Sequence, residues 1–195
     1  MANSRIEQKL KEAALTREMA ELYQDKSDRS SFMMGFVRAV AKDTVLVAYV
    51  YFNGIAGGFY ALHAKDIYSI MTNTQYIKRL RRLYALRKQS HEEVPQVAED
   101  QIENLLRFAQ ETGKIVSIAL RGDGDDIRGL VTSVDARCVE IFQYDRDAKY
   151  DGDVIVYRED ILHVHCDGMK ESNIWLLLHA GDENPDDAAA EKAQD

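Results

Sequence analysis

The stretch GKIVSIALRGDGDDIRGLVTSVD, residues 113–135, decides the fold. Apolar and polar residues alternate near both of its ends, and an acidic, glycine-containing segment separates them. This pattern is typical of two β-strands joined by a turn, because successive side chains of a strand point to opposite faces. The stretch therefore predicts an antiparallel hairpin with Val116, Ile118 and Leu120 on its inner face.

The composition around this hairpin is that of a globular protein. Of 195 residues, 46% are hydrophobic, and the net charge is −8. An acidic chain is not expected to bind nucleic acid through its overall field. The cysteines, Cys138 and Cys166, and the absence of a leader segment predict reduced thiols and a cytoplasmic location. The apolar run at 45–52, VLVAYVYF, is shorter than the roughly 20 residues of a membrane span, so we expect no membrane contact.

Hydrophobic periodicity predicts helices over 5–24, 74–89 and 99–111, the last ending before a Gly113 C-cap. Short strands fill the intervals, and Asn53-Gly54 is a hairpin signal. The predicted domains are a first repeat with its N-terminal helix (1–73), a basic helix and linker (74–98), a second repeat with its leading helix (99–180) and a disordered acidic tail (181–195).

The division into repeats follows from self-similarity. A gapless shift of 94 residues overlays 35–70 on 129–164 and places the helix at 99–111 on residues 5–17. Such self-similarity is typical of a duplicated structural unit, here a helix followed by several short strands. The alternative is two unrelated β segments that share valines. The identical pairs are Gly35 and Gly129, Val37 and Val131, Val40 and Val134, Val45 and Val139, Gly58 and Gly152, Asp66 and Asp160, and Ile67 and Ile161.

Three segments of the second half match a known pattern. VSIAL at 116–120 fits V-x-I-x-L, GLVTSVD at 129–135 fits G-x-φ-x-x-φ-D, and VYREDILHV at 156–164 follows V-Y-K-H-x-I-x-x-V. In these segments the chain resembles the Sm-like (LSm) family and, within it, the bacterial Hfq branch. The first half follows the pattern more loosely, since Ala41 stands where the second half has Asp135.

The resemblance implies an α+β, mainly β fold. It implies two tandem Sm-like (SH3-like) small barrels, each preceded by a helix, with a basic helix between them. Gly129 would allow its strand to bend so that a short sheet curls into a barrel. Edge strands would then pair with neighbours. Because the family forms rings of six or seven units, the resemblance implies a homo-oligomer, with three tandem chains closing a six-unit ring.

The resemblance also implies RNA binding, although its contact residues transfer poorly. The family's lysine–histidine pair corresponds to Arg158 and Glu159, and its base-stacking aromatic residue corresponds to Arg137. Arginine keeps the positive charge and can stack on bases, but Glu159 would repel phosphate.

The helix at 74–89 is the strongest nucleic-acid candidate in the residues themselves. Its cationic side chains can neutralise phosphates. The alternative is that they are solvated or pair with the chain's own acids at 99–103 and in the tail. The basic residues are Lys78, Arg79, Arg81, Arg82, Arg87 and Lys88.

Other polar clusters carry weaker signals. HVHCD at 163–167 lacks a full zinc ligand set, and GDGDD at 122–126 lacks the ligand order of a calcium loop. No nucleophile–base pair or phosphate-cradling loop is recognisable, so we expect neither an enzyme nor a cofactor. The run at 45–52 is apolar on both faces, and we expect one face to pack in the core and the other to form an association surface.

The leading functional hypothesis is a non-enzymatic, RNA-chaperone-like protein that binds RNA at a basic surface made by the 78–88 helix with Arg137 and Arg158. The alternative hypothesis is a protein-interaction or assembly scaffold that has kept the fold without RNA contacts. The acidic turn, Glu159 and the net charge favour the alternative.

Overall fold

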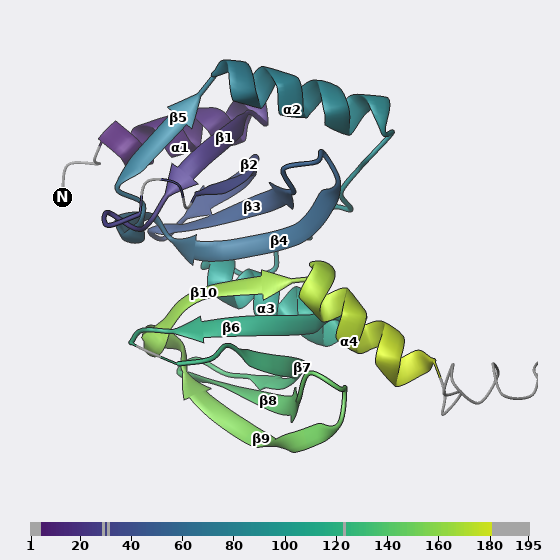
Figure 1. Cartoon of the computed structure of the whole chain (residues 1–195). Coiled ribbons are helices and arrows are strands. Elements are labelled where there is room, and N and C mark those ends of the chain that lie inside the picture. The colour runs from purple at the N-terminus through teal and green to yellow at the C-terminus, as the bar shows by residue number, and fades with distance from the viewer. Residues whose placement is uncertain (1–4, 29, 31, 123, 181–195) are drawn as a thin grey trace, which may run out of the picture.

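A computed structural model of the chain describes residues 5–28, 30, 32–122 and 124–180 (Figure 1). Within these residues the chain forms four α-helices and ten β-strands. The helices are α1 (Arg5–Thr16), α2 (Gln75–Leu86), α3 (Gln101–Thr112) and α4 (Met169–His179). The strands are β1 (Met19–Tyr23), β2 (Met33–Ala41), β3 (Thr44–Val50), β4 (Ala56–His63), β5 (Ser69–Thr72), β6 (Ile115–Leu120), β7 (Ile127–Val134), β8 (Cys138–Tyr144), β9 (Tyr150–Tyr157) and β10 (Ile161–Cys166).

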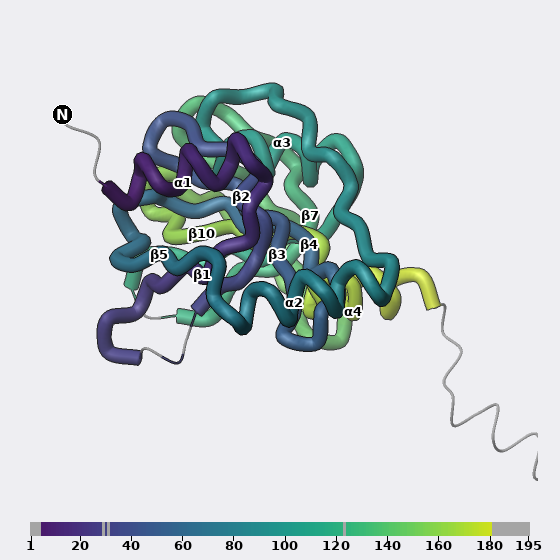
Figure 2. The backbone as a smooth tube through the Cα atoms, turned by 90° about the horizontal axis from the view of Figure 1, so that it is seen from above, coloured from purple at the N-terminus to yellow at the C-terminus, as the bar shows by residue number. Residues whose placement is uncertain are grey.

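These strands form one antiparallel sheet in the order β5-β1-β2-β3-β4-β10-β6-β7-β8-β9. The first half of the chain supplies five adjacent strands and the second half supplies the other five, so the two halves lie one above the other in Figure 1. Seen from the first-half end, α1 and α2 lie across the near side of the molecule (Figure 2). Short 3-10 turns at Ala64–Asp66 and Arg158–Asp160 precede β5 and β10.

Local sequence explains where several elements begin and end. The Asp100 carboxylate accepts a hydrogen bond from the N–H of Glu103 (3.0 Å) and caps α3, which ends at Gly113 with a φ of 66°. The predicted Gly113 cap is thus confirmed. The hairpin at 113–135 is confirmed as β6 paired with β7, and the Asn53-Gly54 turn joins β3 to β4. Val116 and Ile118 are buried as expected, but Leu120 at the end of β6 is 37% exposed, so its predicted place on the inner face is wrong.

The 94-residue shift of the sequence also relates elements of the two halves. β3 corresponds to β8 and β4 to β9, residue for residue, and α2 and α4 begin at corresponding positions. The leading helices, α1 and α3, and the first strands, β1 and β6, correspond at a shift of 96 residues instead. The predicted gapless overlay of the helices is therefore wrong by two residues. Each half therefore repeats one order of elements.

The matching glycines Gly35 and Gly129 allow close approach of two strands. A Cβ atom on Gly129 would lie 2.1 Å from the carbonyl oxygen of Phe142, and one on Gly35 would lie 2.3 Å from that of Ala48. Any larger residue would push β7 away from β8, or β2 away from β3. Each glycine lies two residues before the start of a register shift of the ladder, where strands bend and twist.

The prediction of two tandem small barrels is wrong. β4 pairs with β10 from Phe59 to Leu62, so a single open sheet runs through both halves. α3 belongs to the second half but packs on both, and its Leu105 and Phe108 share one core with Leu46 and Phe59. Strand edges join the halves to each other, and the core between them is common.

Two further expectations are wrong. The helix predicted over 5–24 ends at Thr16, and the remainder forms β1, whose Ala20 and Leu22 are buried. Neither face of β3 is free for association, because Val45 packs in the core beneath α1 and Leu46 in the core beneath α3. The tail at 181–195 lies outside the described residues.

Candidate functional site

Within the described residues the sheet has two free edges, β5 at one end and β9 at the other. The outer side of an edge strand carries backbone N–H and C=O groups that can pair with another strand. β9 also exposes large apolar side chains: Ile155 is 67% exposed, Tyr150 55% and Tyr157 52%. Open backbone groups combined with exposed apolar side chains indicate an association surface.

The centre of the sheet shows a pairing partner for each edge. At the 94-residue shift β9 is the counterpart of β4, and β5 is the counterpart of β10. β4 and β10 pair inside the chain, with Ala61 opposite Val164 and Tyr60 opposite His165. We call this pair the inner junction. Both free edges are counterparts of strands that the chain already pairs with each other.

A glycine pair strengthens this correspondence. Gly58 on β4 has a φ of +77°, and a Cβ atom there would lie 2.2 Å from the carbonyl oxygen of Cys166 at the end of β10. Its counterpart Gly152 on β9 also has a positive φ, +112°, but within the described chain no atom lies within 4 Å of its Cβ position. Asp167 after β10 and Asn73 after β5 share a φ near 60°. Asn73 after β5 therefore has the φ angle that Asp167 adopts beside Gly58. No described residue occupies the space beside Gly152.

A junction between β9 and β5 would be more polar than the inner junction. In the inner junction α3 supplies apolar side chains that contact apolar side chains of the first half. The α1 counterparts are charged, and Lys9 and Glu12 lie 3.5 Å apart. In each of the following pairs the first residue lies at the inner junction and the second is its counterpart near the free edges: Phe59 and Asp153, Leu46 and Glu140, Leu105 and Lys9, and Phe108 and Glu12.

A buried polar cluster fixes α4 to the inner junction. Glu171 is 1% exposed and accepts a hydrogen bond from the Ser117 hydroxyl on β6. Its other carboxylate oxygen lies 3.3 Å from Nδ1 of His165 on β10. Nε2 of His165 lies 2.9 Å from the carbonyl oxygen of Gly57, and the ring stacks on Tyr60 with 4.0 Å between centroids. The cluster thus ties α4 to three strands from both halves.

The electrostatics of this cluster favour a charged glutamate. Burial acts to raise the pKa of Glu171, but the neighbouring imidazole of His165 and the hydrogen bond from Ser117 outweigh it, so the pKa is lowered. Ser117 donates to the carboxylate and not to His165, so the histidine is not placed as a base for the hydroxyl. The arrangement supports positioning of α4 and not nucleophilic chemistry.

The basic residues predicted on α2 are exposed and lie at the first-half end of the sheet (Figure 1). Arg87 donates from Nε to the carbonyl oxygen of Asn53 (3.0 Å). The other five form no ion pair with any described residue, and the acids at 99–103 do not pair with them. The five are Lys78, Arg79, Arg81, Arg82 and Lys88.

The other two predicted contacts, Arg137 and Arg158, lie near β8 and β9 at the opposite end of the sheet. Arg158 forms an ion pair with Glu103 (2.7 Å) and donates to the carbonyl oxygen of Asp135, and its side chain is 15% exposed. Arg137 lies over the ring of Tyr157 at 5.7 Å. The structure therefore does not gather the predicted residues into one surface, and RNA contact by any of them stays a prediction.

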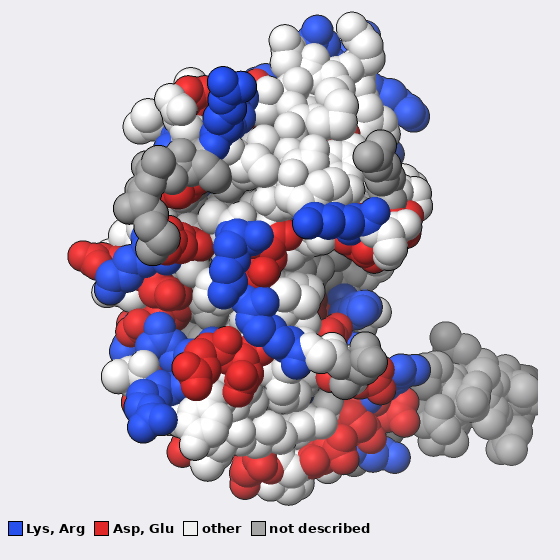
Figure 3. All heavy atoms as spheres, turned by 90° about the vertical axis from the view of Figure 1, so that its left-hand side faces the viewer, with Lys and Arg blue, Asp and Glu red and all other residues white. Residues whose placement is uncertain are grey.

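The surface charge is mixed where it is visible. On the face shown in Figure 3, Lys and Arg side chains are interspersed with Asp and Glu. The described residues hold no group of three or more His, Cys, Asp or Glu side chains suited to a metal ion. Within the same part of the chain every helix is too short or too polar to cross a membrane.

The sequence predicted pairing of edge strands in general but did not identify β5 and β9 as the free edges. The repeat was visible in the sequence, and the matching pair Gly58 and Gly152 is the signal that marks β4 and β9 as equivalent edges.

Comparison of the chain with protein-family models, curated proteins and solved structures finds no match.

Proposed function

We propose that the chain is a self-assembling, non-enzymatic module whose copies join head to tail, with β9 of one chain pairing with β5 of the next. One observation carries the proposal: each free edge is the 94-residue counterpart of one strand of the inner junction. In such strand addition the main-chain hydrogen bonds supply affinity, and the side chains supply specificity.

The inner junction predicts the register of this outer pair. Because Val164 lies opposite Ala61, Ile70 of one chain is expected opposite Ile155 of the next. Ile155, which is 67% exposed in the single chain, would then be covered as fully as Ala61, which is buried.

A head-to-tail contact forms a ring if its rotation closes and a filament if it does not. The three-chain ring that the resemblance implied rests on separate small barrels, which the structure does not have, so the number of chains is left to measurement. Glu140 and Asp153 replace apolar residues of the inner junction. Charge at a sheet edge weakens pairing, so we expect assembly that is reversible and depends on concentration.

Light scattering coupled to size-exclusion chromatography tests the proposal. The mass of the wild type is expected to rise above that of one chain as its concentration rises. Ile155→Lys places a charge on the edge strand, which opposes strand pairing, so the variant is expected to be a monomer. The variant should still fold, because the exposed Ile155 side chain adds little to the stability of a single chain. Leu86→Lys is the matched control, since this residue on α2 is also exposed, at 69%. A wild type that remains a monomer at all concentrations would contradict the proposal.

RNA binding by α2 is a second candidate function, and one observation favours it. Five cationic side chains on or just after α2 are exposed and form no ion pair with the described residues. A ring would present one such helix per chain, and several linked sites raise the apparent affinity.

Fluorescence anisotropy with U-rich and A-rich RNA at two salt concentrations tests this candidate. Arg79→Glu combined with Arg82→Glu is expected to weaken RNA binding by at least about tenfold and to reduce its salt dependence. Lys26→Glu combined with Lys149→Glu changes the net charge equally and is the control. Equal retention of RNA by both double variants would remove α2 as the site.

A further inference from the structure

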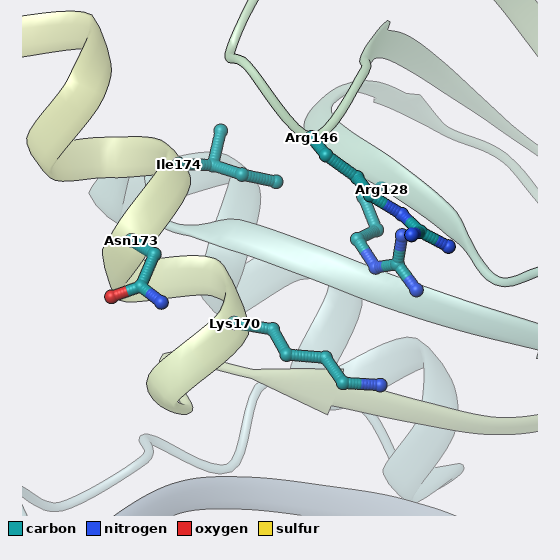
Figure 4. Close-up of a pocket in the computed structure, with 5 residues that line it drawn as sticks. All are labelled: Arg128, Arg146, Lys170, Asn173 and Ile174. Atoms are coloured by element: carbon teal, nitrogen blue, oxygen red, sulfur yellow. The ribbon is translucent and has the colours of Figure 1, made fainter.

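A cationic hollow of about 260 Å³ lies between α4, β7 and the turn that joins β8 to β9 (Figure 4). Arg128 comes from β7 and Arg146 from the turn, and Lys170, Asn173 and Ile174 come from α4. Figure 4 shows the two arginine side chains converging and the lysine side chain extending toward the same space. Three positive side chains thus line one small space in a chain of net charge −8.

The described residues neutralise these cations only in part. One carboxylate oxygen of Asp126 lies 3.4 Å from the Arg128 guanidinium and 3.9 Å from the Lys170 ammonium. Arg146 forms no ion pair with any residue that the structure describes, and Nε of Arg128 is buried without a hydrogen-bond partner there. A buried donor without a partner is rare, and like charges drawn together repel. An anion in the hollow would offset the repulsion between these cations.

The acids beside Arg146 in the sequence, Asp145 and Asp147, form no ion pair with it within the described residues. Asp145 precedes Arg146 in the turn, and its carboxylate accepts hydrogen bonds from the backbone N–H of Asp147 (2.9 Å) and Lys149 (2.8 Å). This carboxylate holds the turn in shape.

The first half shows that the fold does not require these cations. At the 94-residue shift Arg128 corresponds to Met34, which is buried beneath α2 beside Leu80. Arg146 corresponds to Phe52 and Lys170 to Tyr76, so the corresponding place in the first half carries no charge. The charges belong to the second half alone, which points to a role beyond packing.

We propose that this hollow binds the phosphate group of a small phosphate ester of mononucleotide size. Two guanidinium groups present paired N–H donors that match phosphate oxygens, and Lys170 adds a compact charge. Asn173 supplies a further polar group, and Ile174 an apolar contact for the organic part. The volume is just below the usual range for small-ligand sites, about 300–1,000 Å³, which suits one mononucleotide.

Calorimetric titration of the full chain at low salt tests this site, with adenosine 5′-monophosphate, inorganic phosphate and adenosine as probes. The monophosphate is expected to bind most tightly, phosphate more weakly, and adenosine without measurable heat. Arg146→Ala is expected to reduce monophosphate affinity by at least about tenfold, because it removes a charge-assisted contact. Lys149→Ala is the matched control: it removes the same charge from the same turn outside the hollow, and a change below about twofold is expected.

A second variant separates binding from folding. Asp126→Asn removes the carboxylate that competes for Arg128 and Lys170, and it is expected to tighten monophosphate binding several-fold. A merely structural role of these residues predicts no such gain. Equal losses in Arg146→Ala and Lys149→Ala, or no binding of either phosphate probe to the wild type, would overturn the site.

The same phosphate chemistry has two sources, a free nucleotide and an RNA strand. Competition by a short oligoribonucleotide with a 5′-phosphate, and by one with a 5′-hydroxyl, distinguishes them. Displacement of the monophosphate by either strand supports the site with RNA as the source. A lack of displacement supports it with a free ester as the source.

Discussion

α2 and α4 occupy equivalent places in the two halves but are held there by different interactions. At the 94-residue shift Leu80 corresponds to Ile174 and Ile77 to Glu171, and all four are buried. α2 therefore docks through apolar contacts, whereas α4 docks partly through a carboxylate. The place in the fold therefore determines which position is buried, whereas the type of side chain that is buried there differs between the halves.

Each half still has one buried glutamate where the helix meets the first strand. In the first half, Glu21 on β1 accepts a hydrogen bond from the Thr74 hydroxyl just before α2 (2.7 Å). In the second half, Glu171 on α4 accepts one from Ser117 on β6, which is the counterpart of Glu21 at the 96-residue shift. In the first half the carboxylate lies on the strand and the hydroxyl at the start of the helix, whereas in the second half the carboxylate lies on the helix and the hydroxyl on the strand.

The largest effect is expected where α3 and α1 differ. Phe108→Ala removes a buried ring from the core shared by both halves, and should lower the free energy of unfolding by about 3–5 kcal/mol. Glu12→Ala at the α1 counterpart is exposed and should change it by less than about 0.5 kcal/mol. Urea denaturation below the assembly concentration measures both. Similar losses would mean that α1 and α3 are equally embedded.

A smaller effect is expected from the α4 cluster. Glu171→Gln keeps the shape but removes the charge opposite His165, and should lower the free energy of unfolding by about 1–3 kcal/mol. Glu171→Leu imitates the apolar residue of the first half but leaves His165 without the neighbouring carboxylate. It is expected to lower the free energy of unfolding at least as much as Glu171→Gln. A stable Glu171→Leu variant would show that packing alone holds α4.

Acid should loosen α4 before α2. A carboxylate whose pKa is lowered by folding contributes stability that is complete above its unfolded pKa, about 4.3, and is lost as pH falls through the folded value. Trp175 is the only tryptophan and lies on α4, so its fluorescence reports this step. His179 stacks on it, and the titration therefore uses His179→Gln. A fluorescence change that coincides with global unfolding would contradict separate loosening.

A modest effect is expected at the outer edge. Asp153→Phe and Glu140→Leu install the first-half counterparts on the second half. Because apolar burial replaces charge there, the double variant should tighten assembly by roughly tenfold, about 1.4 kcal/mol. Sedimentation at several concentrations measures the change. Unaltered association would place the interface elsewhere.

Strands and turns were predictable because their signals are local. Alternation and turn residues identified the hairpin at 113–135 and the Asn53-Gly54 turn. β1 was missed because Leu22 continues the helical spacing of α1, and only pairing with β2 and β5 makes this segment a strand. The inner junction and the core beneath α3 depend on contacts between residues far apart in sequence, which no local pattern records.

The candidate sites were less predictable for the same reason. Arg158 was selected for its charge, but its ion pair with Glu103 is a tertiary contact. The hollow lined by Arg128, Arg146 and Lys170 draws on a strand, a turn and a helix that are separated in sequence. The free edges were accessible in principle, since the repeat assigns β9 and β5 the same pairing as the strands of the inner junction.

Disulfide cross-linking tests head-to-tail pairing most directly. Ile70→Cys and Ile155→Cys, combined with Cys138→Ser, place the new thiols opposite each other between chains. Directly opposed residues lie about 4.5–5.5 Å apart, within disulfide reach, whereas diagonal ones lie about 7–8 Å apart. We predict rapid formation of covalent oligomers with this pair, and slow formation with Ile70→Cys and Asp153→Cys. Equal rates for the two pairs, or oxidised protein that stays a single chain, would contradict pairing of β9 with β5.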